Sequence, residues 1–123
     1  DRNFTWSTEK LDIVRLNDAA KIIKGDHDFT SFSRNNKNLE HRRCIIYESL
    51  WKEDNEIVNY YITGNRFLHH MVRYLVGTMV EVSRKKIRFE KFKELIENPS
   101  ENAKIFKAPP QGLVLYKVDY ANN

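Results

Sequence analysis

The polar side chains best placed for chemistry lie in one short segment, Asn65 to Arg73, where two adjacent histidines precede an arginine. Apolar residues recur at helical spacing through and beyond this segment, which predicts a helix from Asn65 to Val82. At about 100° per residue the apolar side chains fill an arc of roughly 220°, so most of the helix surface is expected to be buried. The remaining edge carries His69, His70, Arg73, Gly77 and Glu81.

Arg73 has no acidic residue three or four positions away, so a salt bridge along the helix is excluded. A guanidinium at the margin of a mostly buried helix therefore needs a partner from elsewhere in the structure. That partner is either a tertiary carboxylate with no functional role or an anion that belongs to a functional site. Gly77, one turn later, removes a side chain and would let another backbone or a ligand approach.

The adjacent histidines invite a metal-binding interpretation, which the spacing does not favour. Side chains of neighbouring helical residues point about 100° apart, and no cysteine or acidic ligand stands at a partner spacing from His69 or His70. We therefore predict no metal site and expect polar packing or phosphate contact instead. Asp26-His27-Asp28 is interpreted as structural, with its side chains satisfying a turn.

Three segments around this helix are expected to be helical or turn-like. The first is a helix between Asp12 and Gly25, with Asp12 able to cap its start and Gly25 able to end it. Residues 26–32 are predicted to form a turn or short helical hook anchored by two aromatic side chains, and residues 33–41 a loop. A second, shorter helix is expected from Phe89 to Glu97.

Strands are expected in three places, from Arg43 to Lys52, from Glu56 to Thr63 and from Leu113 to Val118. The first two should form a hairpin that turns at residues 53–55, and residues 98–111 should be irregular because they hold all three prolines. This order of elements predicts an α+β fold, in which helices pack on one face of a largely antiparallel sheet.

Composition indicates one globular domain over residues 1–123, without a membrane span or a secretory signal. The lone cysteine, Cys44, lies in an apolar run and cannot form an internal disulfide, which fits a reducing cytoplasm. The net charge of +4 favours polyanionic partners without proving one. Phosphate contact and a solvated face remain equal alternatives for two basic clusters: Arg34, Lys37, Arg42 and Arg43, then Arg84, Lys85, Lys86 and Arg88.

Four ordered motifs resemble the C-terminal domain of the tRNA pseudouridine synthase A family. The segment from Asn65 to Val82 is similar to the signature helix of that family. Trp6 and the helix up to Gly25 resemble the opening of the domain, and Gly25 to Phe32 resembles its GxHDFxxF motif. Ala108 to Leu115, followed by Val118-Asp119-Tyr120, is similar to the closing strand. The resemblance covers essentially the whole chain.

The resemblance implies an enzyme that isomerises uridine to pseudouridine in the tRNA anticodon stem-loop, without metal or cofactor. The catalytic aspartate of the family lies in an Arg-Thr-Asp-Ala-Gly motif, and none of the seven aspartates of this chain has those neighbours. We therefore expect the nucleophile on an N-terminal domain outside this chain, and we expect the chain alone to be inactive. The intact enzyme is expected to be a cytoplasmic homodimer.

The resemblance also implies roles for particular residues. Arg73 aligns with the arginine that pairs with the catalytic aspartate, and Leu113 aligns with the apolar residue that packs against the target base. His69, His70 and Gly77 are expected beside Arg73 in the substrate cleft. Two alternatives stay open, a stand-alone RNA-binding module and a dimerisation scaffold without catalysis.

Overall fold

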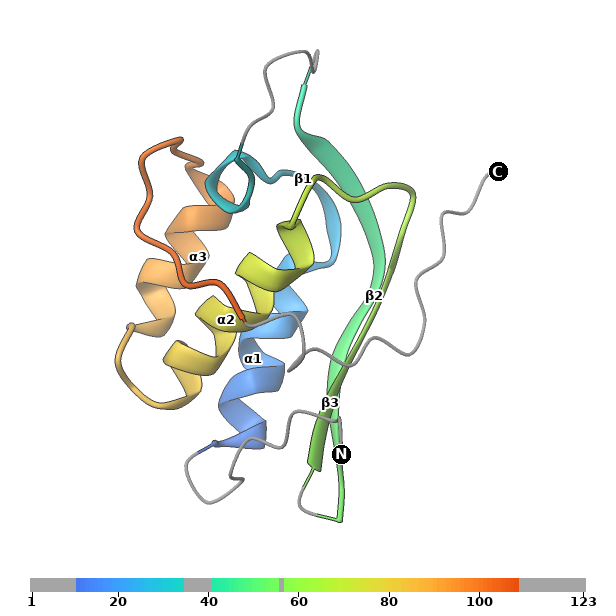
Figure 1. Cartoon of the computed structure of the whole chain (residues 1–123), viewed down its shortest axis with the longest axis vertical. Helices are drawn as coiled ribbons and strands as arrows, with labels where there is room; N and C mark the ends of the chain where they lie inside the picture. Colours follow the sequence, from blue (N-terminus) through green and yellow to red (C-terminus); the bar gives the residue numbers. More distant parts are fainter. Residues whose placement is uncertain (1–10, 35–40, 56, 109–123) are drawn as a thin grey trace.

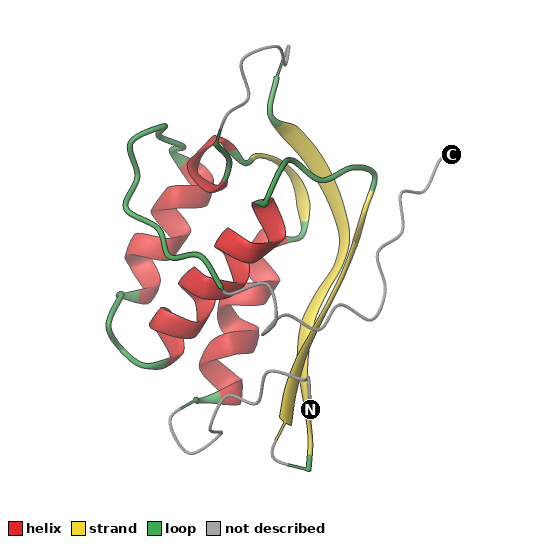
Figure 2. Ribbon diagram, viewed as in Figure 1, coloured by secondary structure: helices red, strands yellow, loops and turns green. Residues whose placement is uncertain are grey.

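The computed structural model describes residues 11–34, 41–55 and 57–108, in which helices cover one face of an antiparallel sheet (Figures 1 and 2). The elements, in chain order, are α1 (Ile13–Ile23), β1 (Gly25–Asp28), the 3-10 turn η2 (Thr30–Phe32), β2 (Arg43–Asp54), β3 (Ile57–Gly64), α2 (Met71–Ser83) and α3 (Phe89–Glu97). This arrangement confirms the predicted α+β class. The expected closing strand, Leu113 to Val118, lies outside the described residues.

Helix α1 forms where the sequence predicted it, with the expected cap. The Asp12 carboxylate accepts hydrogen bonds from the main-chain N–H groups of Val14 at 3.0 Å and Arg15 at 3.2 Å, which satisfies two of the free donors at the helix start. Gly25 follows the helix end with φ +107°, a left-handed conformation that favours glycine. Both ends of this helix are thus set by local sequence.

The sheet has the order β1-β2-β3, with β2 in the centre and both pairings antiparallel. A bulge between Ile46 and Glu48 shifts the register, so that Tyr47 and Glu48 both face outward and the inward alternation resumes at Ser49. Asn55 turns the β2–β3 hairpin with φ 52°. The structure confirms the predicted hairpin, but Glu53 and Asp54 still pair with β3, so the turn is tighter than the predicted residues 53–55.

Strand β1 corrects the prediction of a turn or helical hook for residues 26–32. Gly25 to Asp28 pairs with Arg43 to Ile46, and only Thr30 to Phe32 form a helical turn. The side chains of Phe29 and Phe32 are fully buried, as expected of anchors. The carboxylate of Asp28 accepts hydrogen bonds from the N–H group of Thr30 at 2.9 Å and from its hydroxyl at 2.6 Å, so its predicted structural role in a turn is confirmed.

The core lies between the sheet and the helices. The β2 and β3 side chains that face it include Cys44, Ile46, Trp51, Tyr60 and Ile62, which meet apolar side chains of all three helices. Among the described residues, no helix is long and apolar enough to cross a membrane.

After α3 the chain is irregular through Ala108, as the prolines predicted. Its last part, residues 103–108, runs back over α2 in Figure 1, and we call this segment the strap. The strap meets α2 at Arg73 and Gly77, two of the residues that the sequence singled out.

Candidate functional site

Helix α2 begins at Met71, six residues later than predicted, and this moves the two histidines out of the helix. The side chain of Asn65 accepts a hydrogen bond from the N–H group of Ile45 at 2.8 Å, which ties the end of the β2–β3 pair to the following turn. His70 stands directly before the helix in a left-handed conformation, with φ 58°. His70 therefore reaches Arg73 from a turn, with the His69 ring beside its own. The prediction that both histidines lie on one edge of a continuous helix was wrong.

Arg73 lies in the first turn of α2 and is half-buried. Its Nε donates a hydrogen bond to the carbonyl of Ala108 at 2.9 Å, and its own carbonyl accepts one from the N–H group of Ala108 at 3.0 Å. This reciprocal pair fixes the guanidinium plane against the end of the strap. The Nη1 group lies 3.4 Å from Nδ1 of His70, which leaves the outer edge of the fork for another acceptor.

No carboxylate meets this guanidinium within the part of the chain that the structure describes. The ion pairs there join Arg15 to Asp12, Arg42 to Glu101, Arg43 to Asp26 and Arg84 to Glu81. Arg73 therefore has no acidic partner along its helix, as predicted, and none of the described residues from other elements pairs with it either. A tertiary ion pair with no functional role is not formed there.

Gly77 is the point of closest approach between α2 and the strap. A Cβ atom at this position would lie 2.2 Å from the carbonyl oxygen of Phe106 and 2.9 Å from the nitrogen of Ala108. The hydroxyl of Thr78 accepts a hydrogen bond from the N–H group of Phe106 at 3.2 Å. Of the two partners expected for Gly77, a backbone or a ligand, the structure places a backbone there.

The imidazole rings of His69 and His70 lie beside each other, with centroids 3.8 Å apart. Desolvation, followed by the charges of His69, Lys107 and Arg73, lowers the pKa of His70. A neutral His70 can accept from Arg73 through Nδ1, because its proton then sits on Nε2. The described residues contain no group of three or more histidine, cysteine or acidic side chains that could hold a metal ion.

The first predicted basic cluster is largely committed to holding the fold. Arg34 donates to the carbonyls of Ser33 at 2.8 Å and Ala103 at 3.2 Å, and thereby ties η2 to the strap. Arg42 and Arg43 form the ion pairs with Glu101 and Asp26 given above. Lys37 lies outside the described residues, as does Leu113.

The second basic cluster lies at the far end of α2 from Arg73. Lys85, Lys86 and Arg88 are exposed, while Arg84 pairs with Glu81 at 3.4 Å. Lys85 and Arg88 line an open pocket of about 300 Å³, to which α1 contributes Arg15 and α3 contributes Glu90. Lys85 lies twelve positions after Arg73, which corresponds to roughly 18 Å along a helix axis.

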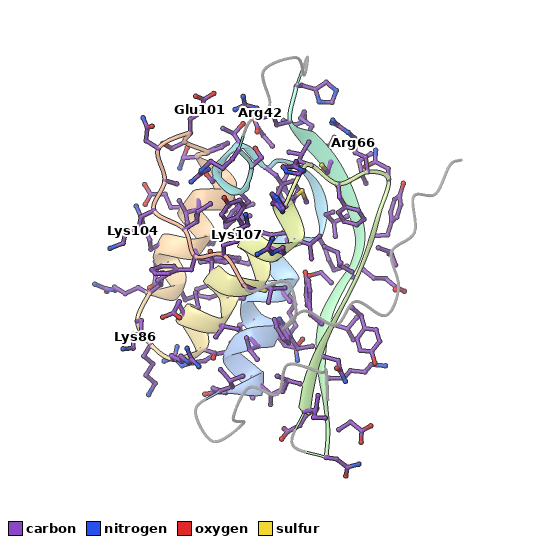
Figure 3. The ribbon with its side chains drawn as sticks, viewed as in Figure 1. Arg42, Arg66, Lys86, Glu101, Lys104 and Lys107 are labelled. Atoms are coloured by element: carbon purple, nitrogen blue, oxygen red, sulfur yellow. The ribbon has the colours of Figure 1, made fainter. Side chains whose placement is uncertain are left out.

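Sequence reasoning missed one cation beside Arg73. Lys107 precedes Ala108 on the strap, and its ammonium lies 5.4 Å from the centroid of the Tyr74 ring (Figure 3). The guanidinium of Arg34 lies 5.3 Å from the centroid of the same ring. In the sequence, Lys107 stands out only because it precedes Ala108, where the segment similar to the closing strand begins. That position does not reveal that the strap returns to α2.

Comparison with known proteins identifies the family of this chain. A tRNA pseudouridine synthase family matches residues 19–121, and this chain belongs to that family. Its relatives include the tRNA pseudouridine synthase A of Dictyoglomus thermophilum, 37% identical over 115 residues, which are 94% of this chain and 46% of that protein. The protein of the same name from Clostridium acetobutylicum is 37% identical over 121 residues, or 98% of this chain and 50% of that protein. The chain thus spans about half the length of the curated relatives that it matches.

Proposed function

We propose that this chain is the C-terminal half of an A-type tRNA pseudouridine synthase and forms the supporting wall of its active site. The whole enzyme would isomerise uridine to pseudouridine in the tRNA anticodon stem-loop, acting as a cytoplasmic homodimer without metal or cofactor. The nucleophilic aspartate would stand on an N-terminal domain. Membership of the family supports the reaction class, and the match to about half of each relative supports the division into two halves.

The observation that carries the proposal is the state of Arg73. Its guanidinium is oriented by the strap through Nε, and no described carboxylate pairs with it. A planar fork held at one edge presents the N–H groups of its other edge in a fixed direction, which suits a carboxylate from another domain. The position is therefore prepared for an anion that the described residues do not provide.

Arg73 would act on that aspartate in two ways. Its permanent positive charge would lower the pKa of the carboxyl group and keep it ionised for attack. Its fixed orientation would also hold the carboxylate in one position while the glycosidic bond breaks, the base turns and a bond to carbon forms. His70, whose pKa is lowered, would stay neutral beside Arg73 and add no competing positive charge.

The remaining site residues would bind substrate. Leu113 would pack against the target base, which must first be extruded from the stem or stacked loop. His69 and His70 would line the cleft beside Arg73, while Gly77 would act indirectly by admitting the strap. The exposed basic side chains Lys85, Lys86 and Arg88 would contact tRNA phosphates.

A comparison of two purified proteins tests the proposal. We expect the whole protein to convert uridines of the anticodon stem-loop, measured by loss of the C5 hydrogen and by mapping pseudouridine in the product tRNA. We expect the 123-residue chain alone to give no conversion, because it has no nucleophile. Turnover by the chain alone, or none by the whole protein on any tRNA, would overturn the assignment.

A further inference from the structure

Lys107 has an anchored main chain and an exposed side chain. The residues on both sides of it are anchored to α2, Phe106 through the Thr78 hydroxyl at 3.2 Å and Ala108 through the Arg73 carbonyl at 3.0 Å. The side chain itself extends over Tyr74, and Figure 3 shows it in front of α2. The strap thus delivers one ammonium group to the surface next to Arg73.

This part of the surface is positively charged and lacks a neutralising group among the described residues. The charges of Arg73 and Lys107 both lower the pKa of His70, as does the charge of His69. Neither Arg73 nor Lys107 belongs to any of the ion pairs in the described part of the chain. Arg34 adds a third positive charge against the Tyr74 ring. Cations gathered without carboxylates favour binding of an anion.

The two cations fit different anions. Arg73 presents a rigid planar fork, which matches a carboxylate, and one aspartate would satisfy it. Lys107 presents a point charge on a flexible stem, which suits a phosphate oxygen whose exact position varies. An RNA substrate brings phosphates on both sides of any nucleotide that enters the site.

We propose that Lys107, held by the strap over Tyr74, binds a backbone phosphate of the tRNA beside the nucleotide that enters the Arg73 site. This inference rests on the proposed function for its substrate, but it assigns a contact that lies outside both predicted basic clusters. The strap would then have two roles, because Ala108 orients Arg73 and Lys107, the residue before it, would bind the RNA.

The test uses the whole protein with substitutions at Lys107 and at a matched control. Lys104 is the control because it is also an exposed lysine of the strap, three residues earlier, and makes no ion pair or ring contact among the described residues (Figure 3). Dissociation constants for unmodified tRNA would be measured across a salt series for the wild type and for Lys107→Ala, Lys107→Arg and Lys104→Ala.

We expect Lys107→Ala to weaken tRNA binding and to reduce the slope of log K against log salt by about 0.7 to 0.9, the loss of one phosphate contact. Its effect on catalysis should fall on the half-saturating tRNA concentration more than on the rate at saturation. Lys107→Arg should keep the wild-type slope because it keeps the charge. Lys104→Ala should keep it within about 0.2.

An unchanged slope in Lys107→Ala would overturn the inference, as would an equal reduction in Lys104→Ala, which would show only a general effect of charge. Because the slope is a binding measurement, it is independent of turnover. A wild type that binds tRNA but does not isomerise uridine would reject the proposed function and leave the Lys107 contact to be judged by the slope. An active wild type with an unchanged slope would reject the Lys107 contact alone.

Discussion

Replacing Gly77 with alanine sets two effects of opposite sign against each other. Inside a helix, alanine is favoured over glycine by about 1 kcal/mol, because glycine loses more backbone entropy on folding. The new methyl carbon, however, would lie 2.2 Å from the carbonyl oxygen of Phe106 and 2.7 Å from its carbonyl carbon. Both are main-chain atoms, so no side-chain rotation relieves the overlap and the strap has to withdraw.

The cost of withdrawal follows from the hydrogen bonds that hold the strap on α2. They are the bond from the Phe106 N–H group to the Thr78 hydroxyl and the reciprocal pair between Arg73 and Ala108. Each is worth about 1 kcal/mol, so losing three against a helical gain of about 1 kcal/mol lowers the free energy of unfolding by about 2 kcal/mol.

Urea denaturation of the chain, followed by far-ultraviolet circular dichroism, would measure this difference from the shift of the midpoint at constant m-value. Thr78→Val is the matched control, because it replaces the accepting hydroxyl with a methyl group of similar size and so removes one of the three bonds without adding bulk. It also removes the bond that the hydroxyl donates to the Tyr74 carbonyl, and the two losses together should cost about 1 to 2 kcal/mol. If Gly77→Ala instead raises the free energy of unfolding by about 1 kcal/mol, as helix propensity alone requires, the strap does not lie against α2 and the reasoning is refuted.

Three further perturbations test other parts of the structure. Asp12→Ala should lower the free energy of unfolding by about 1 kcal/mol through loss of the α1 cap, whereas Asp12→Asn should keep most of it; equal losses would contradict the cap. Burial raises the pKa of the Cys44 thiol from 9.0 to about 11, above its value in the unfolded chain, so its contribution to stability should be complete below pH 9 and fall as the pH rises to 11. Accordingly, native Cys44 should resist alkylation at pH 8 and react once urea unfolds the chain; rapid reaction in the native state would contradict its burial. Lys107→Ala should raise the pKa of His70 in a proton NMR titration, and Lys104→Ala should not; no change in the first variant would show that Lys107 lies elsewhere.

The elements that the sequence predicted well are those fixed by local signals. Helix α1 has a capping aspartate before it and a glycine after it, and the β2–β3 hairpin alternates apolar and polar residues on both sides of its turn. Strand β1 lacks such a signal, because the sequence Gly-Asp-His-Asp has no apolar alternation and is polar enough for a loop. It is a strand because β2 offers an edge for pairing, which no local pattern reveals.

The start of α2 was misplaced because apolar spacing does not distinguish a helix from a packed turn. Phe67 and Leu68 fit the helical period of Met71 and the residues after it, yet they belong to a turn that ends in the left-handed His70. The partner of Arg73 on the strap was equally hidden, since Ala108 is 35 residues away and contributes only its main chain. Sequence indicated that Arg73 needed a partner and that Gly77 made room for one; only the structure shows that the strap meets both.

The central claim, that Arg73 holds a catalytic carboxylate from the other half of the enzyme, is tested most directly by the single-turnover rate of the whole protein on saturating tRNA. We expect Arg73→Ala to lower this rate by about 10² to 10³-fold, the usual cost of removing one fixed electrostatic partner, while tRNA affinity stays within a few fold. Arg73→Lys should also be impaired, because a lysine cannot form the planar two-point contact. Arg66→Ala, which removes an arginine that donates to the Arg43 carbonyl instead, serves as the control and should retain near-normal rate. A near-normal single-turnover rate in Arg73→Ala would contradict the account.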